Sequence, residues 1–180
     1  KEKDILLILD EIQCGMGRTG KMFAHEYYGV KPDVMTLAKA LGCGIPVGAF
    51  LTNEKAAALK PGDHGTTYGG NPLATAAINA VLDLFENTDI LSNVNEVSAY
   101  LESELDKLVD EFDCVTGRRG KGLMQGLILN KPANDVILKA MDEGLLVISA
   151  GAEVLRMVPP LIITKENVDE MITILRKALQ

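Results

Sequence analysis

Two adjacent carboxylates end an apolar run near the start of the chain. The run is ILLILDEIQ, from Ile5 to Gln13, and its last apolar residues are followed by Asp10 and Glu11. Carboxylates in this place serve two chemistries: they hold Mg²⁺ in nucleotide hydrolases, or they pair with a protonated ring nitrogen of an organic cofactor. The first chemistry also needs a phosphate loop of the form G-x-x-x-x-G-K-[ST], which this sequence lacks. The hydrolase interpretation stays open only if another part of a longer protein supplies that loop.

A lysine between an apolar segment and a glycine-rich turn is the second candidate. Lys39 lies in TLAKALGCGIPVGA and is flanked by Leu37, Ala38, Ala40 and Leu41. A single lysine is usually a solvated surface charge, but these neighbours would place the amine in a poorly hydrated site and favour its neutral, nucleophilic form. The turn also has glycines that allow a ligand to approach the backbone, at Gly42, Gly44 and Gly48.

Lys39 and Asp10 together make the minimal residue pair for pyridoxal 5′-phosphate (PLP). The amine can form a Schiff base with the cofactor aldehyde, and the carboxylate can keep the ring nitrogen protonated. The cofactor phosphate needs donors of its own, and HGTTYGGNPLA at residues 64–74 offers the hydroxyls of Thr66 and Thr67 and the start of a helix. Taken alone, the same segment is better explained as a glycine-rich loop before a capped helix.

Arg156 is the last candidate, because it lies in the apolar context VLRMVPP. Its guanidinium either extends to solvent along an apolar stem or is held for bidentate recognition of a carboxylate. The sequence favours neither reading.

The elements expected to position Asp10 and Lys39 form a strand–helix–strand unit. Residues 4–10 predict a fully buried strand, 22–29 a short helix that stops at Gly29, and DVMTLAK a second strand. A crossover of this kind makes the two strands parallel, so their carboxyl ends would share one edge of a sheet. VGAFLT at 47–52 predicts a third strand.

The rest of the chain predicts long helices followed by a second set of strands. One helix begins at Pro72, with Asn71 as its N-cap, and continues to Phe85. A closing helix at 165–179 starts after Thr164. The remaining predictions are helices at 92–112 and 133–143 and strands within 117–129, 144–149 and 153–163. We place a domain boundary near residues 86–95.

The overall composition is that of an ordinary globular protein that takes small molecules as partners. The chain has 180 residues and a formal net charge of −7, so a nucleic-acid partner is not expected. Cys14, Cys43 and Cys114 are far apart and support neither a disulfide framework nor a metal site, which fits a reducing cytoplasm. We find no membrane span or signal peptide. A strand close to a start without Met suggests a fragment of a longer protein.

Three ordered segments resemble the class III PLP-dependent aminotransferases, and within them the bacterial acetylornithine aminotransferases. LDEIQCGMGRTGKMFAHEYYGVKPDVMTLAKALGCGIPVGAF is similar to the cofactor segment of the family, HGTTYGGNPLA to its phosphate loop, and LRMVPPLIIT to its carboxylate-binding segment. The resemblance covers essentially all 180 residues.

For the cofactor, the resemblance implies that Lys39 holds PLP covalently and then acts as the general base for the 1,3-proton shift. Asp10 would pair with the ring nitrogen, and Gln13 would hydrogen-bond near the phenolic oxygen. Glu11 and Ile12 would belong to the same cofactor-contacting segment.

For the substrate and the assembly, the resemblance implies a homodimer with shared active sites. Thr67 would bind the cofactor phosphate of the neighbouring subunit, and Thr66 would lie against the substrate there. Arg156 would clamp the α-carboxylate of the amino donor and of 2-oxoglutarate. Cys14 stands where relatives commonly carry Thr, and Cys43 lies in a turn that is often all glycine in relatives, so the packing of the site would differ in detail.

The fold implied is the α/β fold type I of PLP-dependent transferases. Residues 1–90 would be the later part of the large PLP-binding domain, and residues 91–180 the small C-terminal α/β domain with a short, mostly antiparallel sheet. The preceding half of the family's chain is absent from this sequence, so we expect the 180 residues alone to be catalytically incompetent.

The function implied is transfer of the δ-amino group of N2-acetylornithine to 2-oxoglutarate in arginine biosynthesis. Ornithine, succinylornithine or 4-aminobutyrate could use the same residues, and a PLP-dependent aminomutase is a further alternative. A truncated, non-catalytic domain is the contrasting class; the presence of Lys39 argues against it.

Overall fold

The computed structural model describes residues 3–180, which divide into two compact units between Asp89 and Ile90. The division falls inside the window of residues 86–95 where the sequence places a boundary. The first two residues of the domain predicted at 1–90 lie outside the described residues.

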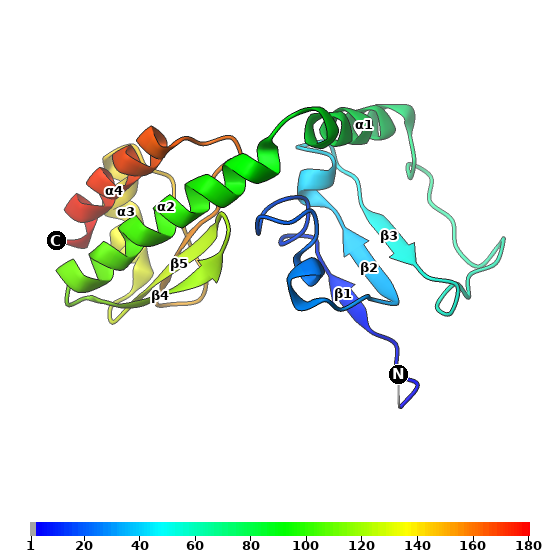
Figure 1. Cartoon of the computed structure of the whole chain (residues 1–180), viewed down its shortest axis with the longest axis horizontal. Helices are drawn as coiled ribbons and strands as arrows, with labels where there is room; N and C mark the ends of the chain where they lie inside the picture. Colours follow the sequence, from blue (N-terminus) through cyan, green and yellow to red (C-terminus); the bar gives the residue numbers. More distant parts are fainter. Residues whose placement is uncertain (1–2) are drawn as a thin grey trace. The chain divides into compact units, whose positions relative to one another are not determined.

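The first unit is a three-stranded sheet with one long helix packed on it (Figure 1). The sheet order is β1-β2-β3, with β1 parallel and β3 antiparallel to β2, so the predicted parallel pairing is confirmed. Two short 3₁₀ helices, η1 and η2, follow β1 and β2. The elements are β1 (Ile8–Asp10), η1 (Ala24–Tyr28), β2 (Val34–Leu37), η2 (Lys39–Leu41), β3 (Ala49–Thr52) and α1 (Pro72–Asn87).

The second unit is a four-stranded sheet with three helices against it (Figure 1). Its order is β4-β5-β7-β6, and every neighbouring pair is antiparallel. The elements are α2 (Ile90–Glu111), β4 (Val115–Lys121), β5 (Met124–Leu129), α3 (Ala133–Asp142), β6 (Ile148–Ser149), β7 (Val154–Met157) and α4 (Lys165–Leu179). The closing helix has the predicted bounds, because the Thr164 hydroxyl caps it.

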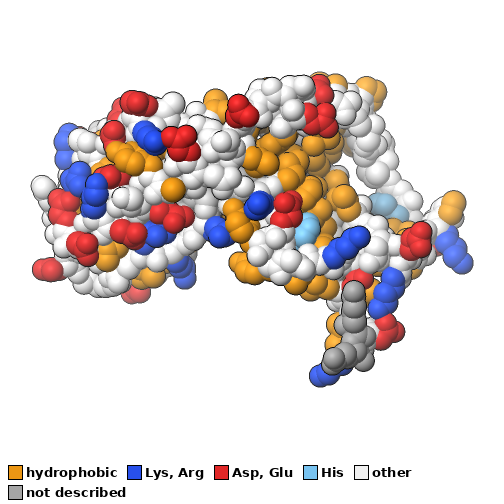
Figure 2. Space-filling model, viewed as in Figure 1, with side chains coloured by type: hydrophobic (Ala, Val, Ile, Leu, Met, Phe, Trp, Pro, Cys, Tyr) orange, Lys and Arg blue, Asp and Glu red, His pale blue; other side chains and the backbone are white. Residues whose placement is uncertain are grey.

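The two units bury very different amounts of apolar side chain. The core of the second unit contains 21 buried residues drawn from its helices and strands. That of the first contains four, against which Ile78, Val81, Leu82 and Phe85 pack from one stripe of α1. Figure 2 shows hydrophobic side chains gathered below α1 on the face of the first unit.

The prediction of a fully buried strand at residues 4–10 is wrong. β1 has only three residues and lies at the edge of the sheet, and Ile5 and Ile8 are 69% and 61% exposed. An apolar run predicts burial only where other elements cover it, and the described residues cover this strand only in part, at the half-buried Leu9. The strand predicted at 144–149 is likewise shorter, because only Ile148–Ser149 pairs with β7.

Residues 3–180 were expected to contain neither a membrane span nor a metal site. No helix there is both long and apolar enough to cross a membrane. No His, Cys, Asp and Glu side chains of the described chain gather into a group that could hold a metal, and its three cysteines are free.

Candidate active site

Asp10 and Lys39 lie at the same edge of the first sheet. β1 ends at Asp10, which pairs in register with Thr36, and β2 ends one residue later at Leu37. Parallel strands end on the same side, and Lys39 begins η2 just beyond β2. The sheet therefore brings the predicted carboxylate and amine to one edge.

The Asp10 carboxylate is exposed and turned back onto its own chain. Its Oδ1 accepts a hydrogen bond of 2.9 Å from the backbone N–H of Ile12. The thiol of Cys14 donates to the Asp10 carbonyl at 3.7 Å. Burial, followed by the charge of Glu11, raises the pKa of the Cys14 thiol, so it stays a neutral donor at physiological pH. The contact from Ile12 orients the Asp10 side chain, and that from Cys14 holds its backbone carbonyl.

Lys39 is exposed, whereas its neighbours Leu37 and Leu41 are buried. The poorly hydrated site that the sequence predicts is therefore not formed by the described residues, because the flanking leucines turn into the core and the lysine turns away from it. The backbone of Lys39 is left-handed, with φ 45°, which a residue with a side chain adopts only at a cost. The turn after it is tight, since a Cβ on Gly42 would lie 2.4 Å from the Ile45 carbonyl oxygen.

Glu11 does not point to this edge. The side chain is 3% exposed, and its carboxylate accepts hydrogen bonds from the backbone N–H groups of Ala24 and His25 at 2.6 and 2.8 Å and contacts His25 Nδ1 at 2.9 Å. That Glu11 belongs to the cofactor-contacting segment stays a prediction; its side chain is buried, whereas that of Asp10 is exposed. The alternation of side chains along an extended segment could have indicated that Glu11 and Asp10 face opposite sides. The sequence has no comparable signal for the contacts of Glu11 with Ala24 and His25. Ile12 and Gln13 are half-buried in the turn that follows.

The predicted phosphate segment is an exposed loop that leads into α1. The Thr66 hydroxyl accepts from Gly69 N–H at 3.1 Å, and Thr67 is exposed. Asn71 caps α1 by accepting from Ala74 N–H at 3.0 Å, with Pro72 in the first turn, as predicted. Exposed hydroxyls before a capped helix can serve as donors to an anion.

Arg156 lies in the second unit, on β7, and is half-buried. It lines a cavity of about 300 Å³ together with apolar residues, among them Leu145, Ile148, Met157 and Pro159. A guanidinium in the wall of an apolar cavity suits bidentate binding of a carboxylate.

Comparisons with known proteins agree on one family. The family model described as aminotransferase class-III matches residues 1–179. An acetylornithine aminotransferase of Gloeobacter violaceus is 51% identical over 97% of this chain and 44% of its own length. Among solved structures, N-acetylornithine aminotransferase from Stenotrophomonas maltophilia has 43% identity and a TM-score of 0.87, over 98% of this chain and 47% of that one. Ornithine δ-aminotransferase of Plasmodium falciparum has 38% identity and a TM-score of 0.93, over 99% and 48%. The chain thus spans about half the length of each protein it matches.

Proposed function

The chain belongs to the class III aminotransferases, and on that premise we propose that it is part of an enzyme that moves the δ-amino group of N2-acetylornithine to 2-oxoglutarate with PLP. The family is one of PLP-dependent transaminases. The observation that carries the proposal is the placement of Lys39 and Asp10 at one sheet edge, in a chain 51% identical to an acetylornithine aminotransferase.

The residues at this edge fit the cofactor chemically. PLP, when bound, supplies an aldehyde for amine exchange and a ring that delocalises the charge left when a proton is removed. An exposed primary amine, an oriented carboxylate and a loop with exposed hydroxyls are the groups that this molecule requires. Lys39, Asp10 and Thr67 would hold its aldehyde carbon, ring nitrogen and phosphate respectively, with Thr67 acting in a neighbouring subunit of a homodimer.

Each residue then has a defined task in the transfer. The Lys39 amine would take up and return the proton of the 1,3-shift, and the Asp10 carboxylate would keep the ring nitrogen protonated. Gln13 donates toward the phenolic oxygen. Arg156 would bind the α-carboxylate of donor and acceptor in turn, which would orient the reacting carbon for proton transfer. Thr66 of a neighbouring subunit would lie against the substrate.

The first test combines mass and site in one experiment. The natural protein that contains this chain is incubated with PLP and reduced with borohydride. Its intact mass is measured, and peptide mapping then locates any lysine that carries a pyridoxyl group. We expect one pyridoxyl group on Lys39, and none on the Lys39→Ala variant, which should also lose turnover. Absence of any adduct on the unaltered protein would overturn the proposal.

Ornithine is the second candidate donor, because the chain superposes on an ornithine δ-aminotransferase with a TM-score of 0.93. Steady-state assays with acetylornithine, ornithine and 4-aminobutyrate separate the donors. We expect the highest kcat/KM for acetylornithine, and a higher value for either other amine would replace it as the substrate.

The 180 residues alone are expected to be inactive, because they span only 44–48% of the related enzymes. Substantial transamination by the isolated chain would refute this expectation. A purely structural role would instead predict that Lys39→Ala leaves the activity of the longer protein unchanged.

A further inference from the structure

We infer that Glu11 and His25 are positioning residues that hold the strand end carrying Asp10. The inference rests on the proposed function, since the orientation of Asp10 matters for catalysis only if it serves the ring nitrogen of PLP. It assigns Glu11 to the supporting structure of the site.

The two adjacent carboxylates have opposite surroundings. Asp10 is exposed at the sheet edge, whereas Glu11 is buried to 3% exposure. The Glu11 N–H donates to the Thr36 carbonyl at 3.0 Å, which ties this residue to β2. The backbone between Asp10 and Glu11 is therefore held by the strand ladder on one side and by the Glu11 side chain on the other.

The Glu11 side chain is satisfied by three contacts to the start of η1. Oε2 accepts from Ala24 N–H at 2.6 Å, and Oε1 accepts from His25 N–H at 2.8 Å and lies 2.9 Å from His25 Nδ1. A buried carboxylate is tolerated only when such donors replace water. The His25 ring faces the carboxylate with Nδ1, which donates to Oε1 in the tautomer that carries its proton there.

Glu11 is closely packed against Gly15, where there is no room for a side chain. A Cβ on Gly15 would come within 2.7 Å of the Glu11 carbonyl oxygen and 3.2 Å of Oε2. Gly15 N–H donates to that carbonyl at 3.0 Å. The His25 ring is itself fixed by stacking on Phe23, with ring centres 5.8 Å apart. Gly15, Phe23 and His25 thus hold Glu11, the residue next to Asp10, in place. We call these four residues, Glu11 included, the clamp.

Replacing Glu11 by its amide should loosen this clamp without removing volume. One carboxylate oxygen becomes an NH₂ group, which cannot accept from a backbone N–H, so a donor of Ala24 or His25 loses its partner. The strand end can then shift, and Asp10 shifts with it.

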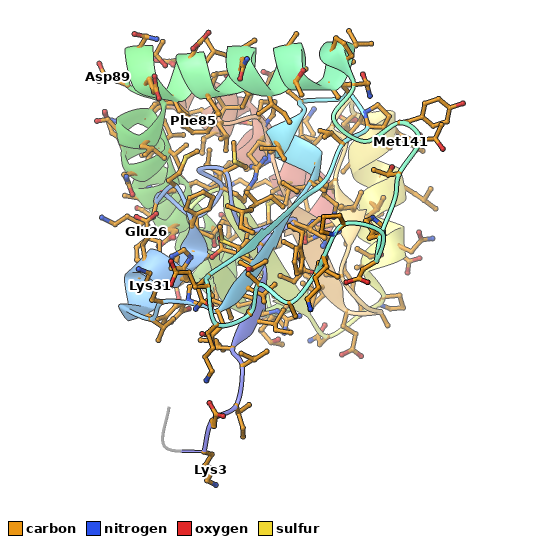
Figure 3. The ribbon with its side chains drawn as sticks, turned by 90° about the vertical axis from the view of Figure 1, so that its right-hand side faces the viewer. Lys3, Glu26, Lys31, Phe85, Asp89 and Met141 are labelled. Atoms are coloured by element: carbon orange, nitrogen blue, oxygen red, sulfur yellow. The ribbon has the colours of Figure 1, made fainter. Side chains whose placement is uncertain are left out.

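The test compares Glu11→Gln with Glu26→Gln in the PLP-binding protein. Glu26 lies on η1 (Figure 3), and its side chain accepts from Phe23 N–H at 2.9 Å, so this control weakens the same helix without touching β1. We expect the apoprotein of Glu11→Gln to bind PLP about tenfold more weakly and Glu26→Gln to stay within about twofold of the unaltered protein. Equal losses in the two variants, or none in Glu11→Gln, would overturn the inference.

A second readout asks whether Glu11 acts through Asp10. The pH at which the absorbance of the Lys39-bound cofactor changes should shift in Glu11→Gln in the same direction as in Asp10→Asn. The double variant should lose little beyond Asp10→Asn alone, because the two residues are coupled. Fully additive losses would show that Glu11 acts independently and would contradict a positioning role.

If Glu11→Gln does not fold, two variants of His25 provide the test instead. His25→Asn keeps a side-chain donor near the place of Nδ1, and His25→Leu removes it. We expect weaker PLP binding and a shifted spectrum only in His25→Leu; the same behaviour in both variants would refute the clamp. Failure of the unaltered protein to form a borohydride-stable adduct on Lys39 would instead refute the proposed function, so the two failures are distinguishable.

Discussion

Arg118 connects two sets of hydrogen bonds in the second unit. Its guanidinium donates to both carboxylate oxygens of Asp106, at 2.8 and 3.2 Å, and to the buried Gln125 Oε1 at 3.1 Å. The Gln125 amide in turn donates to Glu102 at 2.9 Å and to the Gly122 carbonyl at 2.8 Å. One arginine thereby joins α2 to the hairpin of β4 and β5.

The Asp106 carboxyl should make stability depend on pH. The hydrogen bond from Arg118 is the main cause that lowers the pKa of Asp106. A carboxyl with a lowered folded pKa stabilises the protein above its unfolded pKa, near 3.9, and loses that contribution as the pH falls through the folded value. Asp106→Asn should therefore cost about 0.5 kcal/mol at pH 7, after allowance for solvent screening, and almost nothing at pH 2.

Urea unfolding at the two pH values measures this difference. Asp110→Asn is the matched control, because Asp110 is exposed on the same helix. A cost that is the same at pH 7 and pH 2 would mean that Arg118 does not stabilise the ionised Asp106.

At the scale of elements, the start of α1 has two separable properties. Asn71 caps the helix, and the same helix end is the proposed neighbour of the cofactor phosphate. Asn71→Ala should lower the free energy of unfolding by about 1 kcal/mol, because Ala74 N–H loses its acceptor. Asn71→Asp should keep the cap but repel the phosphate, so that PLP binds more weakly at unchanged stability. Unchanged PLP affinity in Asn71→Asp would place the phosphate elsewhere.

The β4–β5 hairpin has no room for a side chain at Gly120. Gly120 has φ 145°, and a Cβ there would lie 2.2 Å from the Met124 carbonyl oxygen. Gly120→Ala should therefore destabilise the second unit by more than about 1 kcal/mol in chemical denaturation. Gly117→Ala on the same strand is the control, since its Cβ would meet Ile128 at an ordinary 3.9 Å and should be tolerated. Similar costs for both would remove the steric explanation.

Local signals predicted some elements well and others poorly. The Asn71–Pro72 pair and Thr164 are complete start signals within a few residues, and both helices begin where these residues place them. The helix predicted at 22–29 is instead the shorter 3₁₀ helix Ala24–Tyr28, whose start is held by Glu11, the residue that follows β1. The prediction that residues 4–10 are buried is wrong for a related reason. The start of the helix and the burial of the strand both depend on parts of the protein that are distant in sequence.

The site shows the same division between local and distant information. The apolar runs and the helical crossover between them were enough to predict that Asp10 and Lys39 share a sheet edge. Exposure of Lys39 could not be predicted, because it depends on what covers that edge. The contact between Glu11 and His25 joins residues 14 positions apart and has no periodic signal in the sequence.

At the scale of the whole molecule, the two units should differ in their ability to fold alone. The second unit has a core of 21 buried residues, and every strand of its sheet has at least one paired neighbour. The first unit has four buried core residues and leaves Ile5, Ile8 and Phe50 57–69% exposed. Burial of apolar surface is the main source of folding free energy, so the first unit alone has too little. We expect residues 90–180 to unfold cooperatively as a monomer.

Residues 1–89 should instead associate or lack a cooperative transition, because their apolar side chains stay exposed. Separate expression of the two units, with urea unfolding and sedimentation velocity, tests both expectations. A cooperative, monomeric first unit would show that its sheet needs no cover, and the exposed apolar residues would then require another explanation. A second unit that fails to fold would mean that its core depends on contacts from elsewhere in the protein, in spite of its size.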